Sequence, residues 1–282
     1  MAEVGGQAAE GKVVVRAILL TSTFQRHVFV ANTIAAACDL AGVWQEEKTF
    51  QPKQYANDAD DERVIARHFS ARDESEKRYF SGHEAVRLDS VSAHRVVPTG
   101  ACSGAAEVER MIAARPDVVL VFGTGILREP FLSAFEGRIL NIHLGLSPYY
   151  RGAGTNFWPL VNREPEYVGA TIHYLDAGID TGPIVSHARP SIEAGDGPHD
   201  LGNKTIVAAA QALILAAAAH LSGTVRAVPQ WGGGRLYQRK DFSAGAVRTL
   251  YRNFESSMIT EYLDARDTRD AALQLIGAEG AA

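Results

Sequence analysis

Residues 117–122 have the sequence DVVLVF, and residues 138–143 have the sequence RILNIH. Each contains a run of apolar, often β-branched residues about one strand long, which is typical of a strand buried on both faces of a parallel sheet. Between them, residues 128–135 are expected to form a short helix. A strand, a helix and a second strand at this spacing predict a βαβ unit and therefore an α/β fold.

The chain before this unit continues the same alternation. Val13 to Leu20 (VVVRAILL) is another near-continuous apolar run and predicts a buried strand. The carboxylates of residues 57–62 are expected at a helix start, where they favour the positive end of the helix dipole. The other expected elements are a helix ending near 40, strands over 41–46 and 91–98, and a helix over 104–114. Together, these expected strands and helices predict an open, largely parallel sheet.

The chain after Pro148 has a different texture. A Gly-rich loop over 149–155 is followed by a short helix that Thr155 is expected to cap. Strands over 168–175 and 184–192 are expected to flank a loop of turn-forming residues, as in a hairpin. Further on we expect a helix over 200–222, a break at Trp231-Gly-Gly-Gly234 and helices over 243–282. We divide the chain into a disordered leader (1–12), a main domain (13–222) and a mostly helical extension (223–282).

Composition excludes several classes of protein. The chain has 282 residues, of which 46% are hydrophobic and 22% charged, with a net charge of −5. This weak acidity argues against a nucleic-acid or anionic-membrane binder. The apolar stretch over 206–221 is short and Ala-rich, which favours a buried helix over a membrane span. Cys38 and Cys102 form no CxxC motif, and no signal peptide is evident, so we expect a reducing cytoplasm.

Several familiar motifs fail at a specific position. Gly123-Thr-Gly125 follows a strand, but the third glycine of a dinucleotide fingerprint would fall at Arg128, which favours a tight turn. The sequence 176–187 lacks the final Glu of a calcium loop, since His187 stands there. Neither HExxH nor GxSxG occurs, so we expect no metal and no nucleophile elbow.

One polar pair interrupts the apolar strand over 138–143. Asn141 and His143 lie at its end, and residues two apart in a strand point to the same side. The carboxyl edge of an open α/β sheet is where ligands bind. Burying such a pair without partners is costly, so it is either a site or a hydrogen-bonded pair that closes the sheet edge.

An ordered set of short motifs contains this pair. Its members are Asn141-x-His143, Pro148, Arg151-Gly152, Gly169-Ala-Thr-Ile-His173 and Asp180-x-Gly182-Pro183. With these spacings, the chain from about Val13 to Ile192 resembles the formyltetrahydrofolate-dependent formyltransferase family. That family includes glycinamide ribonucleotide transformylase, methionyl-tRNA formyltransferase and the sugar N-formyltransferases. The resemblance implies a Rossmann-like sheet (the formyltransferase fold) and N10-formyltetrahydrofolate as the formyl donor.

The resemblance also implies that Asn141, His143 and Asp180 fill the family's catalytic Asn-His-Asp positions. These residue types suit formyl transfer to an amine, which passes through a tetrahedral intermediate with a developing oxyanion. The Asn141 amide and a protonated His143 can both donate hydrogen bonds to that oxygen. Asp180, directly or through a water, can accept the proton of the amine and keep His143 cationic.

Ligand contacts follow from the resemblance in the same way. The residues expected to cradle the pterin are Gly123, Gly125, Ile126, Leu127, Asp176, Gly178 and Ile179. The residues expected to contact the acceptor are Tyr149, Arg151 and Gly152. For Arg151 two roles are open: binding an anionic group of the acceptor, or holding its own loop. For His173 there are also two: supporting the catalytic residues, or a purely structural role.

Departures from the family pattern narrow the acceptor. Gly145 stands where the family usually has Ser, and residues 21–27 lack the Gly-rich phosphate loop of the purine enzyme. Basic and acidic residues after Gly223 nearly balance, which argues against tRNA. By elimination we expect a small primary amine, an amino sugar that is free or nucleotide-linked. The alternatives are hydrolysis of formyltetrahydrofolate, another specialised amine, or a non-catalytic folate or sugar-nucleotide binder.

The extension carries one further pattern. Apolar residues recur near helical spacing at Val247, Leu250, Phe254, Met258 and Leu263. They can belong to the core or, since members of the family often pair through their C-terminal regions, to the interface of a homodimer.

Overall fold

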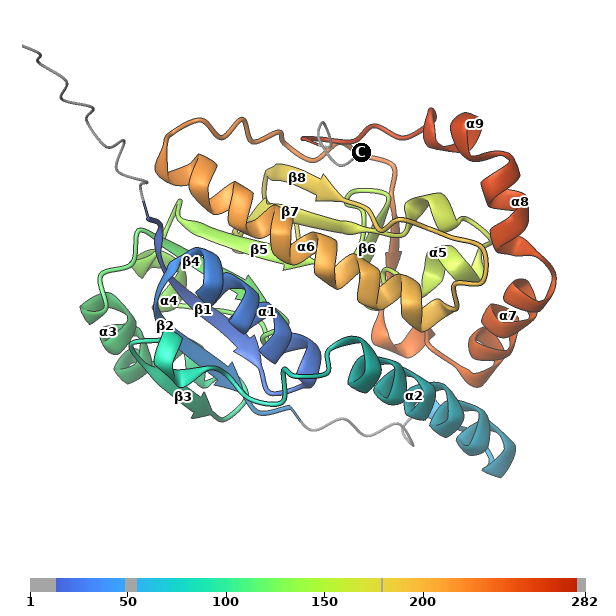
Figure 1. Cartoon of the computed structure of the whole chain (residues 1–282), viewed down its shortest axis with the longest axis horizontal. Coiled ribbons are helices and arrows are strands. Elements are labelled where there is room, and N and C mark those ends of the chain that lie inside the picture. The colour runs from blue at the N-terminus through green and yellow to red at the C-terminus, as the bar shows by residue number, and fades with distance from the viewer. Residues whose placement is uncertain (1–13, 49–54, 179, 278–282) are drawn as a thin grey trace, which may run out of the picture.

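The computed structural model describes residues 14–48, 55–178 and 180–277. The leader predicted for residues 1–12 lies outside the described residues. Seven strands form one sheet in the order β3-β2-β1-β4-β5-β7-β8 (Figure 1). They are β1 (Arg16–Ser22), β2 (Asp39–Glu46), β3 (His94–Val97), β4 (Val118–Phe122), β5 (Ile139–His143), β7 (Ala170–Tyr174) and β8 (Ile184–Ala188).

The first five strands in this order pair in parallel, whereas β7 and β8 pair antiparallel with their neighbours. The predicted open, largely parallel α/β sheet is therefore confirmed, and so is the hairpin after it. The helices are α1 (Gln25–Ala37), α2 (Ala59–Tyr79), α3 (Ala105–Ala113), α4 (Phe131–Ala134), α5 (Trp158–Val161), α6 (Pro198–Leu221), α7 (Ala244–Glu255), α8 (Met258–Asp264) and α9 (Arg266–Asp270).

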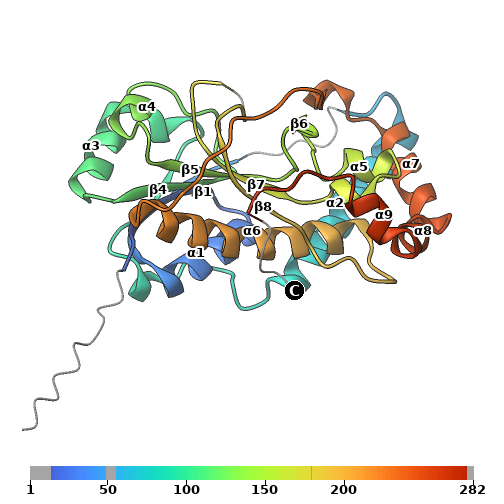
Figure 2. The same ribbon diagram turned by 90° about the horizontal axis from the view of Figure 1, so that it is seen from above.

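Successive residues of the central strands pack on opposite faces of the sheet. In β1, Ala17 and Leu19 belong to one buried cluster, while Ile18 and Leu20 belong to the other. Helices α1 and α6 cover the first face, and α3 and α4 cover the second (Figure 2). Because both faces are covered, the strand needs apolar residues at every position, which is the pattern that the sequence shows.

Helix α6 lies across one face of the sheet (Figure 1). By length and composition alone it could cross a membrane. One side of it, including Leu201, Ile206 and Leu213, is buried and packs toward β5, β7 and β8, and Leu215 on the other side is exposed. The buried helix predicted over 200–222 is present and begins at Pro198.

The extension packs on the rest of the chain through α7 and α8. Val247, Leu250 and Met258 are fully buried, and Leu250 and Met258 share a cluster with Leu160 of α5. These three residues therefore belong to the core of the chain and not to a homodimer interface. The helical region expected over 243–282 is wrong in detail, because Ser257 adopts a left-handed conformation between α7 and α8 and the last described helix ends at Asp270.

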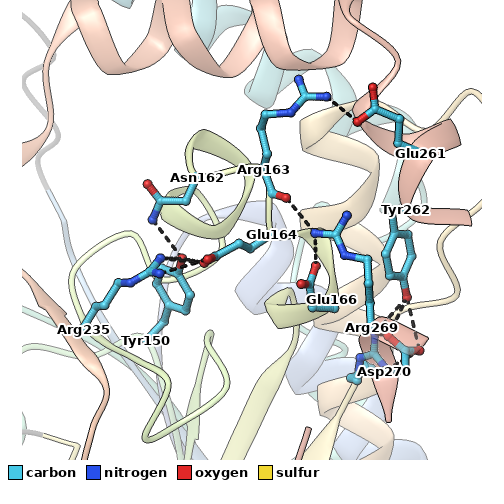
Figure 3. A network of polar contacts seen from close by, with 11 residues as sticks. Tyr150, Asn162, Arg163, Glu164, Glu166, Arg235, Glu261, Tyr262, Arg269 and Asp270 are labelled. Carbon is cyan, nitrogen blue, oxygen red and sulfur yellow. Dashed lines mark hydrogen bonds and ion pairs between the residues drawn. The ribbon is translucent and has the colours of Figure 1, made fainter. Parts of the chain in front are cut away.

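Ion pairs fasten the extension to the segment 162–167 (Figure 3). The Arg269 guanidinium donates to the Glu166 carboxylate at 2.6 Å and to the backbone carbonyl of Arg163 at 2.7 Å. The Arg163 side chain in turn pairs with Glu261 of α8 at 2.7 Å. Contacts of this kind join α8 and α9 to the loop that follows α5.

A short two-stranded sheet was not predicted from the sequence. It pairs β6 (Tyr150–Gly152) in parallel with β9 (Arg235–Tyr237). Gly152 has a φ of 89°, and a Cβ there would lie 2.1 Å from the Tyr237 carbonyl oxygen, so only glycine fits. Both strands fall in segments that were expected to be loops, because three residues are too few to show alternation.

Candidate active site

Strand β5 presents Asn141 and His143 on one face of the sheet, as their spacing predicts. In the β5–β7 register, Asn141 lies opposite His173 and His143 lies opposite Thr171. Both site side chains are mostly buried, with 8% and 7% exposed. The antiparallel pairing with β7 therefore places a second histidine directly beside the polar pair.

Asp180 reaches the same place from the loop between β7 and β8. Its Oδ2 atom lies 3.2 Å from Nδ1 of His143, although 37 residues separate the two along the chain. The Asp180 backbone adopts the left-handed region with a φ of 53°, which Asp tolerates better than most residues. The three predicted catalytic residues thus meet at the carboxyl edge of the sheet.

His173 contacts both Asn141 and Asp180. Its Nδ1 atom lies 2.8 Å from the Tyr174 carbonyl oxygen, which can only accept, so Nδ1 carries a proton. Its Nε2 atom lies 2.9 Å from the Asn141 side-chain amide and 3.7 Å from Oδ1 of Asp180. The fully buried ring contacts both of these predicted catalytic residues, so the supporting role fits the geometry.

The charge of Asp180 follows from these neighbours. Burial raises the pKa of its carboxyl group, but hydrogen bonds from His143 and His173 and the charge on these rings lower it more. The net pKa is well below the usual range of an Asp. Asp180 is therefore ionised at neutral pH and is a weak base, which makes it a better electrostatic partner for His143 than a strong proton acceptor.

The loop that carries Asp180 is fixed at several points. The Asp176 carboxylate accepts hydrogen bonds from the Gly178 amide at 3.0 Å and the Thr181 hydroxyl at 2.8 Å. Gln230 donates from Nε2 to the carbonyl oxygens of Asp180, at 2.7 Å, and Gly182, at 2.9 Å. Gln230 was not identified from the sequence, since a lone Gln near a Gly-rich break gives no signal.

Ile179, expected to contact the pterin, lies outside the described residues.

Gly145 lies next to Nε2 of His143, the ring nitrogen that does not contact Asp180. A Cβ on Gly145 would lie 2.9 Å from Nε2 of His143 and 2.5 Å from Cβ of Thr155. Thr155 therefore fills the space that the family's usual Ser would need. Thr155 was expected to cap a helix, but α5 begins only at Trp158, and the Thr155 hydroxyl instead donates to the Leu144 carbonyl oxygen.

The Nε2 atom of His143 is buried and has no hydrogen-bond partner among the described residues. A buried polar nitrogen without a partner is costly, so such an atom at a sheet edge indicates a ligand contact. It faces the region between β5 and Thr155.

The expected pterin residues after β4 form a turn that two unpredicted residues fix. Glu46 accepts hydrogen bonds from the amides of Gly125 at 2.7 Å and Gly100 at 3.0 Å. The ammonium of Lys48 donates to the carbonyl oxygens of Gly123 and Thr124. Glu46 is the last residue of β2, the strand on the far side of β1, and Lys48 follows two residues later; no motif marked either of them.

Two residues of that turn differ in exposure. Leu127 is buried in the core, whereas Ile126 is 61% exposed. Ile126 belongs to the turn after β4, the strand that pairs with β5, and its exposed side chain can contact the apolar ring of a ligand.

The expected acceptor residues do not gather at His143 as a group. The Tyr149 hydroxyl accepts a hydrogen bond from the Gln274 amide at 2.7 Å, and Gly152 lies in the β6–β9 sheet. Arg151 is half-buried, and its Nε atom has no partner among the described residues. Within residues 14–48, 55–178 and 180–277, no group of three His, Cys, Asp or Glu side chains could hold a metal ion.

An α/β domain with Asn, His and Asp gathered at the sheet edge is the architecture that the motif resemblance implies. A family model described as Formyl transferase matches residues 12–217 of the chain. The chain belongs to the formyl transferase family.

Individual relatives share parts of the chain. Phosphoribosylglycinamide formyltransferase of Escherichia coli (strain K12) is 32% identical over 125 residues, which are 43% of this chain and 58% of that protein. Methionyl-tRNA formyltransferase of Thermodesulfovibrio yellowstonii is 31% identical over 126 residues, 44% of this chain and 41% of that protein. The chain thus aligns with only about half the length of these curated relatives.

Among solved structures, a sugar N-formyltransferase from Shewanella sp FDAARGOS_354 superposes with a TM-score of 0.52 at 15% identity. The alignment covers 81% of this chain and 78% of that chain, and it shows a common fold. The names of these three proteins refer to three different acceptors, so the family is shown while the acceptor is not.

Proposed function

We propose that this protein transfers the formyl group of N10-formyltetrahydrofolate to a primary amine of a small molecule. The acceptor that we propose is an amino sugar, free or nucleotide-linked. The observation that carries the proposal is the His143–Asp180 contact of 3.2 Å, with the opposite imidazole nitrogen buried, unpartnered among the described residues and beside Asn141.

The oxyanion of the tetrahedral intermediate needs hydrogen-bond donors. A proton on Nε2 of His143 supplies one donor, and the side-chain amide of Asn141 supplies another. With its proton on Nδ1, His173 accepts a hydrogen bond at Nε2 from the Asn141 side-chain NH2 group at 2.9 Å, and the second hydrogen of that group remains to donate to the oxyanion. Removal of one oxyanion donor typically lowers kcat by about 10²–10³-fold.

Asp180 stabilises the cationic form of His143. Its lowered pKa keeps it ionised at neutral pH, so the imidazolium has an anionic partner when the amine attacks. The proton released by the amine then passes to Asp180, directly or through a water, and on to solvent, because a carboxylate with so low a pKa does not retain it.

The formyl donor fits the glycine-rich turn after β4. The exposed Ile126 offers an apolar contact for the pterin ring, while the side chains of His27 and Glu46 occupy the space beside Gly123 and Gly125. The loop held by Asp176 supplies the opposite wall in this proposal.

The experiment follows tetrahydrofolate appearance from N10-formyltetrahydrofolate with a panel of primary amines, including free and nucleotide-linked amino sugars. Amine-dependent release together with a formylated product supports the proposal. Release at the same rate without any amine assigns the protein as a hydrolase instead. The Asp264→Asn variant, which changes an exposed carboxylate of α8, serves as a control for Asp180→Asn.

A further inference from the structure

Residues 228–235 form a segment, here called the strap, that runs from the edge strand β8 to the loop that follows β5. At its first residue, Val228 pairs with Ile184, and each backbone amide donates to the carbonyl oxygen of the other at 2.8 Å. At its last residue, the Arg235 amide donates to the Tyr149 carbonyl oxygen at 2.8 Å. Backbone hydrogen bonds therefore fix the strap at both ends.

The middle of the strap packs closely on the same two parts of the chain. The centroid of the Trp231 ring lies 5.8 Å from that of Tyr149 and 6.4 Å from that of His187 in β8. A Cβ on Gly234 would lie 1.4 Å from the Pro148 carbonyl oxygen, so the two backbones are in contact and no other residue fits. These contacts leave the strap little freedom, so a side chain that it carries is a fixed support.

The strap directs the half-buried side chain of Gln230 at the loop between β7 and β8. Its Nε2 atom donates to the carbonyl oxygens of Asp180 at 2.7 Å and Gly182 at 2.9 Å. The amide cannot be turned over, because Oε1 would then face two carbonyl oxygens. The Oε1 atom is buried and has no partner among the described residues, so the two carbonyl groups set the orientation of the amide.

The contacts of Asp176 differ in kind, because they stay within the loop. Its carboxylate accepts from the Gly178 amide and the Thr181 hydroxyl, so these bonds fix the shape of the loop but move with it. Gln230 instead joins the loop to a segment that lies 50 residues beyond Asp180 in the chain. It therefore fixes where the tip of the loop lies relative to the strap.

The position of Asp180 has a narrow tolerance. Its Oδ2 atom lies 3.2 Å from Nδ1 of His143, and a shift of about 1 Å would take the two atoms beyond hydrogen-bond distance. Its φ of 53° is one that non-glycine residues adopt rarely, so neighbouring groups must hold it. Gln230 binds the carbonyl group of this same residue, and so holds the backbone conformation from which the carboxylate contacts the imidazole.

We infer that Gln230 is a positioning residue for formyl transfer: by binding the backbone of Asp180 and Gly182, it holds the Asp180 carboxylate against His143. Gln230 lies outside residues 12–217, which the family model matches, so the inference gives the C-terminal extension a part in the reaction. It rests on the proposed function, because it requires Asp180 to support His143 in that reaction.

The first test measures kcat for Gln230→Leu in two backgrounds, from the initial rate of tetrahydrofolate appearance with an acceptor found in the amine screen. Leu has no donor, so kcat should fall about 10–100-fold, as it does when a catalytic group is slightly misplaced, with KM within about twofold of the wild-type value. In Asp180→Asn the same substitution should lower kcat by less than about twofold, since the carboxylate that Gln230 positions is already absent. Gln211→Leu, at an exposed glutamine of α6, is the matched control and should leave kcat unchanged.

The second test needs no acceptor. The ionised Asp180 carboxylate can only accept, so Nδ1 of His143 carries the proton between them, and proton NMR reports on that hydrogen bond. The resonance is identified by its absence in His143→Ala. We expect it to move upfield in Asp180→Asn and in Gln230→Leu, because the bond is weakened, and to stay in place in Gln211→Leu.

Each outcome decides the inference. Equal fold losses of kcat in the two backgrounds, or an unmoved His143 resonance in Gln230→Leu, overturn it. If thermal unfolding shows that Gln230→Leu does not fold, Gln230→Glu decides in both tests, because its carboxylate puts an oxygen in place of the NH2 group. A wild type that transfers formyl to no amine refutes the proposed function alone, and the His143 resonance still decides whether Gln230 positions Asp180.

Discussion

The sheet edge around Asn141 and the C-terminal extension hold their functional groups by different means. At the sheet edge, backbone pairing between β5 and β7 places Asn141 opposite His173. In the extension, side-chain ion pairs and aromatic contacts hold α7 to α9 against the rest of the chain. Backbone pairing fixes a side chain more precisely than surface contacts do, and it positions Asn141 and His143.

The two regions also differ in charge. At the sheet edge, the pKa of Asp180 is lowered, so the site is ionic at neutral pH. Where α2 meets the extension, burial lowers the pKa of His68 to about 3 and that of His199 to about 4, so both rings are neutral. One region therefore depends on a charge and the other on the absence of one.

The largest effect should follow from substitutions at the sheet edge. Asn141→Ala, His143→Ala and Asp180→Asn each remove a donor or the charge that supports it, and we expect kcat to fall about 10²–10⁴-fold. The check is the initial rate of tetrahydrofolate appearance with an acceptor found in the amine screen.

Thermal unfolding of these variants should show an intact fold. Near-wild-type turnover in Asp180→Asn would contradict the role assigned to its carboxylate.

A smaller effect should come from Gly145, which lies next to His143 at the sheet edge. In Gly145→Ser the new Cβ would meet Thr155 and Nε2 of His143 at 2.5 Å and 2.9 Å, closer than van der Waals contact allows. We expect a roughly 10–100-fold loss of kcat/KM, since a small misplacement of a catalytic group has effects of this order. Steady-state kinetics provide the measurement.

The double variant Gly145→Ser/Thr155→Gly removes one of the two clashes and should recover part of the activity. A Gly145→Ser enzyme with unchanged kinetics would show that Thr155 can move aside. Gly137→Ser, at a turn with open space around its Cα, tests serine substitution away from the site, with some cost from its positive φ.

Much of the sheet edge could be predicted from the sequence because its signals are local. The apolar runs predict buried strands, and the spacing of Asn141 and His143 puts both on one face. The contact with Asp180 could be inferred only through the family resemblance, because it depends on the return of the chain through β7. Gln230 and Glu46 could not be inferred at all, since each acts by binding backbone groups that any residue possesses.

Less of the extension could be predicted from the sequence. Val247, Leu250 and Met258 predict helices with a buried side, but not the surface against which they pack. Ring contacts join Phe69 of α2, Phe157 and Phe242, and no short-range pattern links the three segments that carry them. A surface assembled from side chains of distant segments leaves no periodic trace in the sequence.

The attachment of the extension should respond moderately to loss of one buried contact. Arg269→Ala leaves the mostly buried Glu166 carboxylate without its cation, and we expect the free energy of unfolding to fall by about 2 kcal/mol. Chemical denaturation measures this change. The exposed pair Arg63–Asp60 is the comparison, and Arg63→Ala should cost no more than about 0.5 kcal/mol.

If the two arginine variants lose equal stability, the contacts of Figure 3 do not fasten the extension. Formyl transfer to a small free amine should change little in Arg269→Ala, because β5 and β7 do not depend on this contact.

The smallest effect that we expect is a loss of folding stability in mild acid. His68 binds a proton with an ordinary pKa near 6.5 in the unfolded chain and with a pKa of about 3 in the folded one. The unfolded state therefore binds more protons between these values, and stability falls as the pH falls through this window. We expect a loss of about 1 kcal/mol between pH 7 and pH 5.5 from this residue. Denaturation midpoints at the two pH values measure it.

In His68→Leu this part of the pH dependence should disappear, although the variant also loses the contact between Nδ1 of His68 and the Tyr251 hydroxyl at 3.2 Å. Asp180 gives no loss in the same window, because a carboxyl group with a lowered pKa loses its stabilising charge only below the ordinary Asp range. Mild acid should thus loosen the contact between α2 and α7 before it discharges Asp180. An unchanged pH slope in His68→Leu would mean that this buried ring is not the group that senses acid.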